Sequence, residues 1–102
     1  MESLYESRPW LRSYPHWAPG DLEIGSATAI GDFLSTAASK PDQTAIYYFD
    51  TPITYRALDR WSDSLAAAFA HMGIQCGDRL LVDLQNVPQF LITVYAAWKL
   101  GA

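Results

Sequence analysis

A chain of 102 residues has room for one small domain and buries only about 60–65% of its extended surface, so its stability is marginal without a partner. Its net charge is −4 and its seven Lys and Arg residues are scattered, which argues against a sequence-independent nucleic-acid binder with a basic face. The single cysteine excludes an intrachain disulfide framework and favours a reducing, cytoplasmic location. No secretory leader is recognisable, and no apolar run approaches the roughly 20 residues of a membrane span.

Residues 1–25 form a segment rich in proline and large aromatic residues. Proline fixes φ and removes a backbone donor, so this pattern predicts an extended arm without regular structure. Its anchors would be Trp10, Leu11, Tyr14 and Trp17. We expect the arm to pack on a protein surface. If that surface belongs to a second subunit, the arm is an oligomerisation module. Contact with a membrane interface would be at most peripheral.

The next residues predict a helix followed by a hairpin. Apolar side chains recur at helical spacing over residues 29–39, and Thr28 is placed to cap this helix. Pro41 ends it, because a residue before proline avoids the α region. Residues 44–49 are rich in β-branched and aromatic side chains and predict a strand, with a short return strand over 53–55.

A longer amphipathic helix is predicted over residues 55–72, with Thr54 as its cap and Gly73 as its left-handed stop. Its apolar positions are spaced by three and four residues and form one stripe: Leu58, Trp61, Leu65, Phe69 and Met72. The opposite face is polar, so we expect one side of this helix to pack on a core.

Residues 79–84 alternate little in polarity, as expected of a strand inside a parallel sheet. Residues 88–100 predict a helix that is apolar on nearly every side and must be buried on most of its surface. Together these elements predict an α/β fold with a right-handed βαβ crossover. Because too little chain is present to cover the last helix, we interpret residues 26–102 as the first, incomplete α/β portion of a larger domain.

Few single residues carry a chemical signal. Asp59 and Asp63 lie four apart on one helix, but arginines are interleaved with them, so a solvated ion-pair face is the better interpretation. Lys99 stands at a helix end, where a cation complements the helix dipole. The remaining candidates are interpreted as ordinary side chains without nucleophile or metal chemistry: His16, His71 and Cys76.

Asn86 follows the predicted strand 79–84. The ends of such strands collect binding residues in open α/β sheets. Two interpretations stay open at this point. In one, Asn86 lines a substrate channel; in the other, it caps the helix that begins at Pro88.

Five short blocks in residues 28–102 resemble the opening of the adenylate-forming, AMP-binding superfamily. They read Ile53-Thr-Tyr-Arg-Ala-Leu-Asp, Ser62-Asp-Ser-Leu-Ala-Ala-Ala-Phe-Ala, Gly73-Ile-Gln-Cys-Gly-Asp-Arg-Leu, Leu84-Gln-Asn-Val-Pro-Gln-Phe and Trp98-Lys-Leu-Gly-Ala. The arm is similar to the start of bacterial long-chain fatty-acid–CoA ligases. Its matching stretches are Trp10-Leu-Arg-Ser-Tyr-Pro and Ala18-Pro-Gly-Asp-Leu-Glu-Ile.

The resemblance implies a two-step reaction. A carboxylate attacks the α-phosphate of ATP to give an acyl-adenylate and pyrophosphate, and the sulfur of CoA then displaces AMP. ATP, Mg²⁺, CoA and a fatty acid are therefore implied for the intact enzyme. The loop rich in Ser, Thr and Gly, the acidic motif and the lid lysine expected for this chemistry do not occur here. We expect this segment to hold no catalytic residue, metal or cofactor and to pack against the remainder of its own chain.

Departures from the family pattern affect helix starts alone. Ala57 replaces a glutamate that would complete a capping box after Thr54. Gln85 and Val87 replace a proline and a small polar residue in the loop before the last helix. Two alternatives to a fatty-acid–CoA ligase segment stay open besides the oligomerisation module. They are an amino-acid adenylation domain and a freestanding small α/β binding domain.

Overall fold

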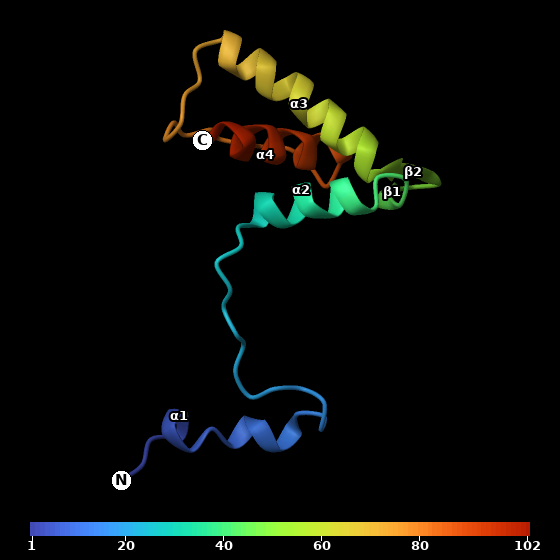
Figure 1. Cartoon of the computed structure of the whole chain (residues 1–102). Coiled ribbons are helices and arrows are strands. Elements are labelled where there is room, and N and C mark those ends of the chain that lie inside the picture. Colours follow the sequence, from blue (N-terminus) through green and yellow to red (C-terminus); the bar gives the residue numbers. More distant parts are fainter.

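The computed structural model describes residues 1–102 as a bundle of helices with one hairpin, preceded by a separate N-terminal segment (Figure 1). Its elements in chain order are α1 (Leu4–Ser7), the 3₁₀ helix η1 (Pro9–Ser13), α2 (Ala29–Ser39), β1 (Thr44–Tyr48), β2 (Thr51–Thr54), α3 (Tyr55–His71) and α4 (Pro88–Leu100). The α/β class is confirmed. The predicted helices and the hairpin form within one or two residues of their expected bounds.

Local capping explains where α2 and α3 begin. The Thr28 hydroxyl accepts the amide proton of Gly31 at 3.0 Å, and the Thr54 hydroxyl accepts that of Ala57 at 3.1 Å. Both caps were predicted from sequence and are confirmed. Each cap satisfies one of the amides that a helix start leaves unpaired.

The sheet consists of β1 and β2 alone, paired antiparallel. The predicted interior strand over residues 79–84 is wrong for this chain, and no βαβ crossover forms, because no second strand lies beside that segment to complete a ladder. A strand exists only through its neighbours, whereas a capped helix satisfies its own backbone. The physical basis of this error is therefore a missing partner.

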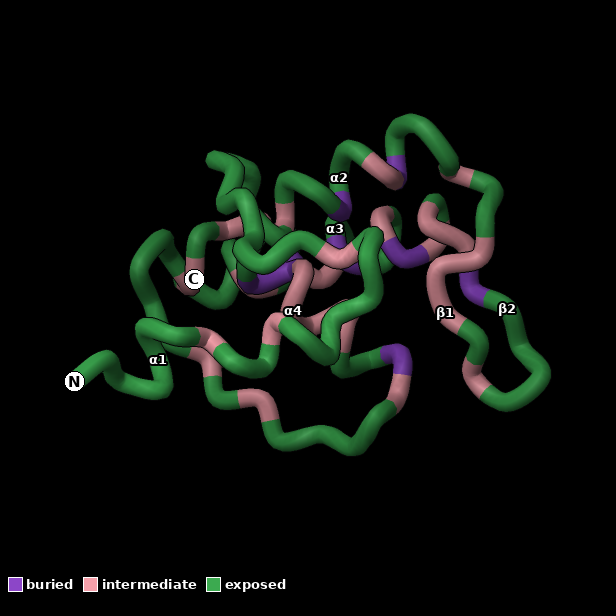
Figure 2. The backbone as a smooth tube through the Cα atoms, turned by 90° about the horizontal axis from the view of Figure 1, so that it is seen from below, coloured by how far each residue is buried: buried purple, intermediate pink, exposed green.

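The core lies where α2, α3, α4 and the hairpin meet (Figure 2). Four buried residues form its centre: Phe33, Ala37, Ile53 and Leu58. The buried face of α3 is rotated from the predicted stripe, because Trp61 and Met72 stay 48% and 75% exposed. Small residues replace them at the α4 contact, since Ser62 and Ala96 are both fully buried. Small side chains let the two helices approach closely.

Helix α4 is confirmed as a mostly apolar helix, and it remains partly uncovered. Ala96 and Ala97 are buried, but Phe90 and Trp98 are 36% and 42% exposed. Its C-terminal cap is Gly101 at φ +79°, where a Cβ would stand 2.7 Å from the Cys76 Sγ. Only glycine both adopts this positive φ without strain and leaves room for the Cys76 sulfur.

The N-terminal segment contains regular structure, so the predicted irregular arm is wrong in this respect. A capping box between Ser3 and Glu6 starts α1, and Pro9 occupies the first turn of η1. Arg8, at φ +47°, donates to both carboxylate oxygens of Asp21 at 2.8 and 3.1 Å and also to the Gly20 carbonyl. These hydrogen bonds hold Arg8, at the start of η1, against residues 20 and 21 of the same segment.

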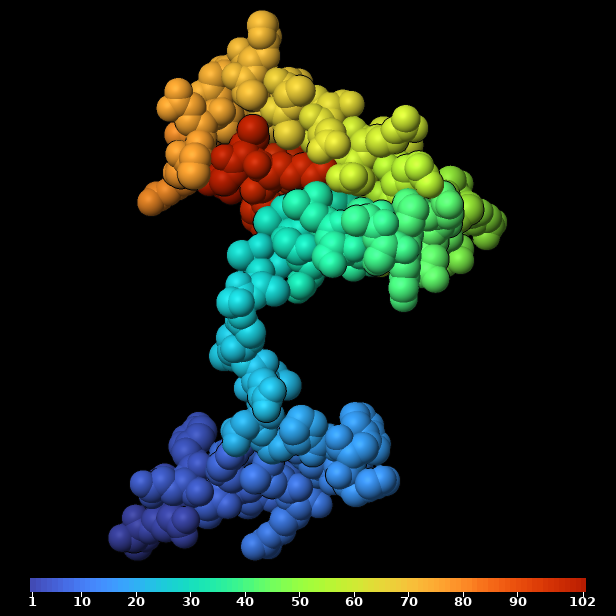
Figure 3. All heavy atoms as spheres, viewed as in Figure 1, coloured from blue at the N-terminus to red at the C-terminus, as the bar shows by residue number.

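An extended linker separates this segment from the helices, and the spheres in Figure 3 show the two parts standing apart. The aromatic residues of the N-terminal segment therefore pack at most on one another. Tyr5 and Trp10 do so, with ring centroids 6.1 Å apart. Trp17 and Ile24 are 76% and 95% exposed. The proposed boundary between residues 1–25 and 26–102 stays a prediction.

Candidate functional site

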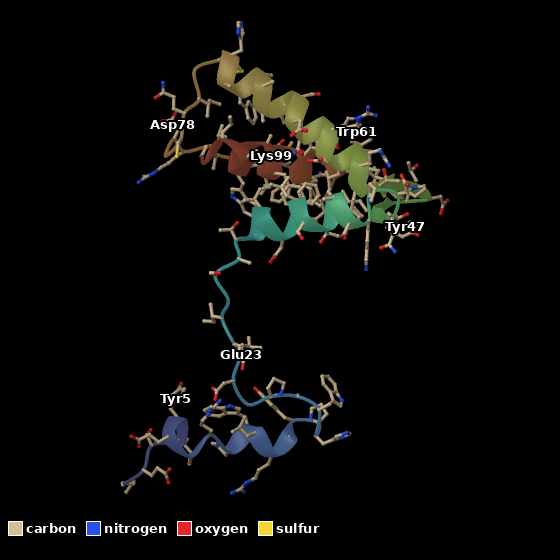
Figure 4. The ribbon with its side chains drawn as sticks, viewed as in Figure 1. Tyr5, Glu23, Tyr47, Trp61, Asp78 and Lys99 are labelled. Atoms are coloured by element: carbon tan, nitrogen blue, oxygen red, sulfur yellow. The ribbon has the colours of Figure 1, made fainter.

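An apolar groove of about 280 Å³ lies between β1 and the start of α4. Tyr47 marks the hairpin side of this region in Figure 4. Six of the eight lining residues are hydrophobic, and the lining is formed by Ile46, Tyr47, Tyr48, Asn86, Val87, Pro88, Phe90 and Leu91. Such a lining accommodates an apolar chain far better than a phosphate.

Asn86 is exposed and lies in this groove. The interpretation of Asn86 as a helix cap is wrong, because Val87 occupies the cap position of α4 and no side chain bonds the free amides. Pro88 at the first turn reduces the need for a cap, since proline has no amide proton to satisfy. The role of Asn86 in a substrate channel stays a prediction.

A second polar constellation surrounds the Lys99 side chain, between α3 and α4 in Figure 4. The Lys99 Nζ donates to Asp59 Oδ1 at 2.6 Å, Asp63 Oδ1 at 2.7 Å and Ser62 Oγ at 2.8 Å. The Asp59 backbone carbonyl accepts a further hydrogen bond from the same ammonium at 3.1 Å. The Lys99 side chain is only 10% exposed, and its ammonium lies 5.8 Å from the centre of the Phe33 ring. All of its bonding capacity is used within the fold.

Two interpretations from sequence are corrected by this cluster. Lys99 does not cap its own helix dipole, because its side chain crosses to α3. Asp59 and Asp63 bind this lysine and not the interleaved arginines, and Arg56 pairs with Asp42 at 2.9 Å. The sequence did contain a signal for this cluster. One predicted helix is apolar with a single cation, and the other carries oxygen-bearing side chains at positions 59, 62 and 63 on one face.

An aromatic group lies beside this cluster. Tyr95 stacks on Phe33 with ring centroids 4.2 Å apart and planes inclined by 16°. Burial raises the pKa of the Tyr95 phenol, and the nearby Tyr55 phenol raises it further. Both effects disfavour the phenolate, so Tyr95 keeps its proton in the folded chain at neutral pH.

The other titratable candidates stay apart from one another. Cys76 is an exposed free thiol, and His16 and His71 are exposed. No group of three or more His, Cys, Asp or Glu side chains is arranged to hold a metal ion. No helix combines the length and apolar character needed to cross a bilayer.

The comparison with known proteins identifies the family. The family described as AMP-binding enzyme matches residues 33–102, which is more than half of the chain. The chain belongs to the AMP-binding enzyme family. This assignment runs from within α2 through α4 and confirms the resemblance found in the sequence blocks.

Individual relatives in this family carry different names. The long-chain-fatty-acid–CoA ligase of Bacillus subtilis is 34% identical over 98 residues, which cover 96% of this chain and 18% of that protein. The 2,3-dihydroxybenzoate-AMP ligase of the same organism is 42% identical over 73 residues, covering 71% and 14%. The long-chain-fatty-acid–CoA ligase of Yersinia pestis is 27% identical over 94 residues, covering 90% and 17%.

The chain therefore spans less than a fifth of the length of these relatives. No solved structure matches it significantly. The names of these relatives refer to different acids, so the family match does not identify a substrate for this chain.

Proposed function

We propose that this chain is the N-terminal portion of an ATP-dependent fatty-acid–CoA ligase. The intact enzyme would join a fatty acid to AMP with release of pyrophosphate and then pass the acyl group to CoA. This portion would form part of the scaffold and one wall of the acyl pocket, without a catalytic residue of its own. A cytoplasmic location belongs to the same proposal.

The proposal of a fatty acid as the substrate rests on how much of the chain each sequence match covers. The two relatives named as long-chain-fatty-acid–CoA ligases match 96% and 90% of the chain, whereas the dihydroxybenzoate ligase matches 71%. A match of 96% must extend through most of the N-terminal segment, which the family match at residues 33–102 does not include. Similarity in that segment favours the fatty-acid–CoA ligases.

The groove supports the same assignment through its chemistry. Its apolar walls suit the methylene chain of a fatty acid, and Asn86 is the polar lining side chain that could orient one. The neighbouring helix α4 is anchored to α3 by the Lys99 cluster, so one wall of the groove is held in place. A wall of this kind positions substrate and performs no bond-making step.

The residues present do not fit the phosphates of ATP. The ammonium of Lys99, whose side chain is 10% exposed, is already bonded to two carboxylates and a hydroxyl. No glycine-rich loop provides a cradle of amides, because the six glycines are isolated in the sequence. We therefore assign ATP, Mg²⁺ and CoA to other parts of the intact enzyme.

A second candidate function is the adenylation of another carboxylic acid. The observation in its favour is the 42% identity to a dihydroxybenzoate ligase, which exceeds the 34% identity to the Bacillus subtilis fatty-acid–CoA ligase. An aryl acid or an amino acid would then replace the fatty acid. The shorter extent of this match leaves the N-terminal segment unexplained.

A substrate panel separates the two candidates. The intact enzyme would be assayed for pyrophosphate release with ATP–Mg²⁺ and, in turn, a long-chain fatty acid, 2,3-dihydroxybenzoate and a mixture of amino acids. The fatty acid should give the highest kcat/KM, and CoA should convert the product to a thioester. A preference for the aryl acid or an amino acid would reject the fatty-acid–CoA ligase assignment.

The N-terminal segment gives a third role, as an oligomerisation module of the intact enzyme. Its exposed Trp17 and Ile24 touch no part of the helical body and are available to a second subunit. Deleting residues 1–25 and measuring the mass by light scattering tests this role. An unchanged mass would remove it.

A further inference from the structure

Hydrophobic packing alone leaves the rotation of α4 on α3 undetermined. Helix α4 is apolar on nearly every side and carries a single charge, that of Lys99. The facing helices bury small side chains, those of Ser62 and Ala66 on α3 and of Ala96 and Ala97 on α4. A unique packing requires side chains that interlock, and small ones interlock little. Other rotations of α4 would therefore bury a similar apolar surface.

The Lys99 ammonium makes these rotations unequal in free energy. It lies between α3 and α4 (Figure 4) and donates to the carboxylates of Asp59 and Asp63, which are one turn apart, at 2.6 and 2.7 Å. The hydroxyl of Ser62 accepts a third hydrogen bond at 2.8 Å. Rotating α4 by one residue turns the lysine by about 100°, and sliding it by one turn moves the lysine by about 5.4 Å. Either change breaks these bonds and leaves charges unpaired at a packed interface, which is strongly unfavourable.

We propose that the Lys99 cluster, formed by Lys99, Asp59, Ser62 and Asp63, selects one rotation and one axial position of α4 on α3 and adds little net stability. Desolvation offsets most of the attraction within a buried ion pair, so apolar replacement of all its charges leaves stability nearly unchanged. Removing the lysine alone is different, because two carboxylates then lose their partner. The cluster thus acts on the choice between packings of the same two helices.

The rotation of α4 determines which of its side chains reach the rest of the fold. In the observed rotation Tyr95 stacks on Phe33 of α2, with ring centroids 4.2 Å apart. Phe90 and Leu91 line the groove beside β1. The Lys99 ammonium also lies 5.8 Å from the centre of the Phe33 ring, so it contacts α2 as well as α3. Lys99 is therefore a positioning residue for the groove wall, and this inference does not depend on what the groove binds.

The test is the concerted replacement Lys99→Met, Asp59→Leu and Asp63→Leu in the 102-residue chain. Far-UV circular dichroism and urea titration should give the wild-type helix content and an unfolding midpoint equal to or above that of the wild type. Nuclear Overhauser contacts between the Phe33 and Tyr95 rings should be lost, and the resonances of α4 should broaden or multiply, because α4 then samples several rotations. A cluster that contributed stability alone would lower the midpoint and leave these contacts in place.

A matched control makes the same change in charge at three exposed positions outside the cluster, with Lys40→Met, Glu23→Leu and Asp83→Leu. It should keep the contacts between the Phe33 and Tyr95 rings. A concerted variant that also keeps them, with one set of α4 resonances, overturns the proposal, because packing alone then selects the rotation. A concerted variant that loses its helix content overturns it as well, since the cluster is then required for stability. Absence of these ring contacts from the wild-type chain has the same consequence.

Discussion

At the scale of the residue, the Lys99 ammonium is the main polar link between α3 and α4. It donates hydrogen bonds to three side chains on one face of α3, those of Asp59, Ser62 and Asp63. Ser62 is fully buried; its hydroxyl donates to the Asp59 carbonyl at 2.9 Å and would lose the donor that it accepts from if the lysine were removed. The contact therefore fixes which faces of the two helices meet.

The change Lys99→Met keeps the length of the side chain and removes its charge. We predict that it lowers the free energy of unfolding by about 1–3 kcal/mol, because two carboxylates and a buried hydroxyl lose a donor. The lower part of this range allows for the 34% and 65% exposure of the two aspartates, which water already screens. Urea titration followed by circular dichroism measures the loss. Lys40→Met, at an exposed position, is the control, and an equal loss there would contradict this role.

Tyr95 provides a pH-dependent prediction. Because burial raises its pKa in the folded chain, the stability contributed by the shift is complete below the unfolded pKa of about 10. It is lost as the pH rises through the higher folded value. Tyr95→Phe should match the wild type near neutral pH and lose less stability above pH about 10. Urea midpoints across this range measure the difference, and parallel profiles would refute it.

Residue roles were predictable to the extent that they are local. Thr28 and Thr54 were identified as caps because a cap bonds an amide three residues away. The Lys99 cluster was missed because its members are separated by 36 to 40 positions in sequence. Spacing along a chain does not show which faces of two helices will meet.

At the scale of the element, each helix carries its own start and stop, and this makes α2, α3 and α4 predictable. The strand predicted over residues 79–84 does not form, because a strand depends on a neighbouring strand to pair with and none lies beside this segment. The N-terminal segment shows the reverse error. Its prolines suggested irregular structure, yet Pro9 lies in the first turn of η1, where a proline is tolerated.

Thr54→Ala tests the contribution of a single cap at this scale. Losing the bond to the Ala57 amide should destabilise α3 by about 1 kcal/mol. Thr54→Ser keeps the hydroxyl and should cost much less. Thermal unfolding of the two variants gives the comparison. Equal destabilisation would mean that packing of the threonine methyl, and not the cap, determines the effect.

At the scale of the whole molecule, this chain has a small core and a large uncovered apolar surface. Only nine residues are buried, while Leu81, Phe90 and Trp98 remain partly or wholly exposed. Large exposed apolar patches mark surfaces that another polypeptide covers. The family match, the relatives' greater length and the unpaired backbone of residues 79–84 support the proposed scaffold role.

The central claim is that this portion provides scaffold and no contact to ATP. Calorimetric titration of the 102-residue chain with ATP–Mg²⁺ tests it most directly, with helix content checked beforehand by circular dichroism. We predict no saturable heat, because the Lys99 ammonium is engaged within the fold and no amide cradle is present. A saturable isotherm with a dissociation constant in the micromolar range would contradict this account.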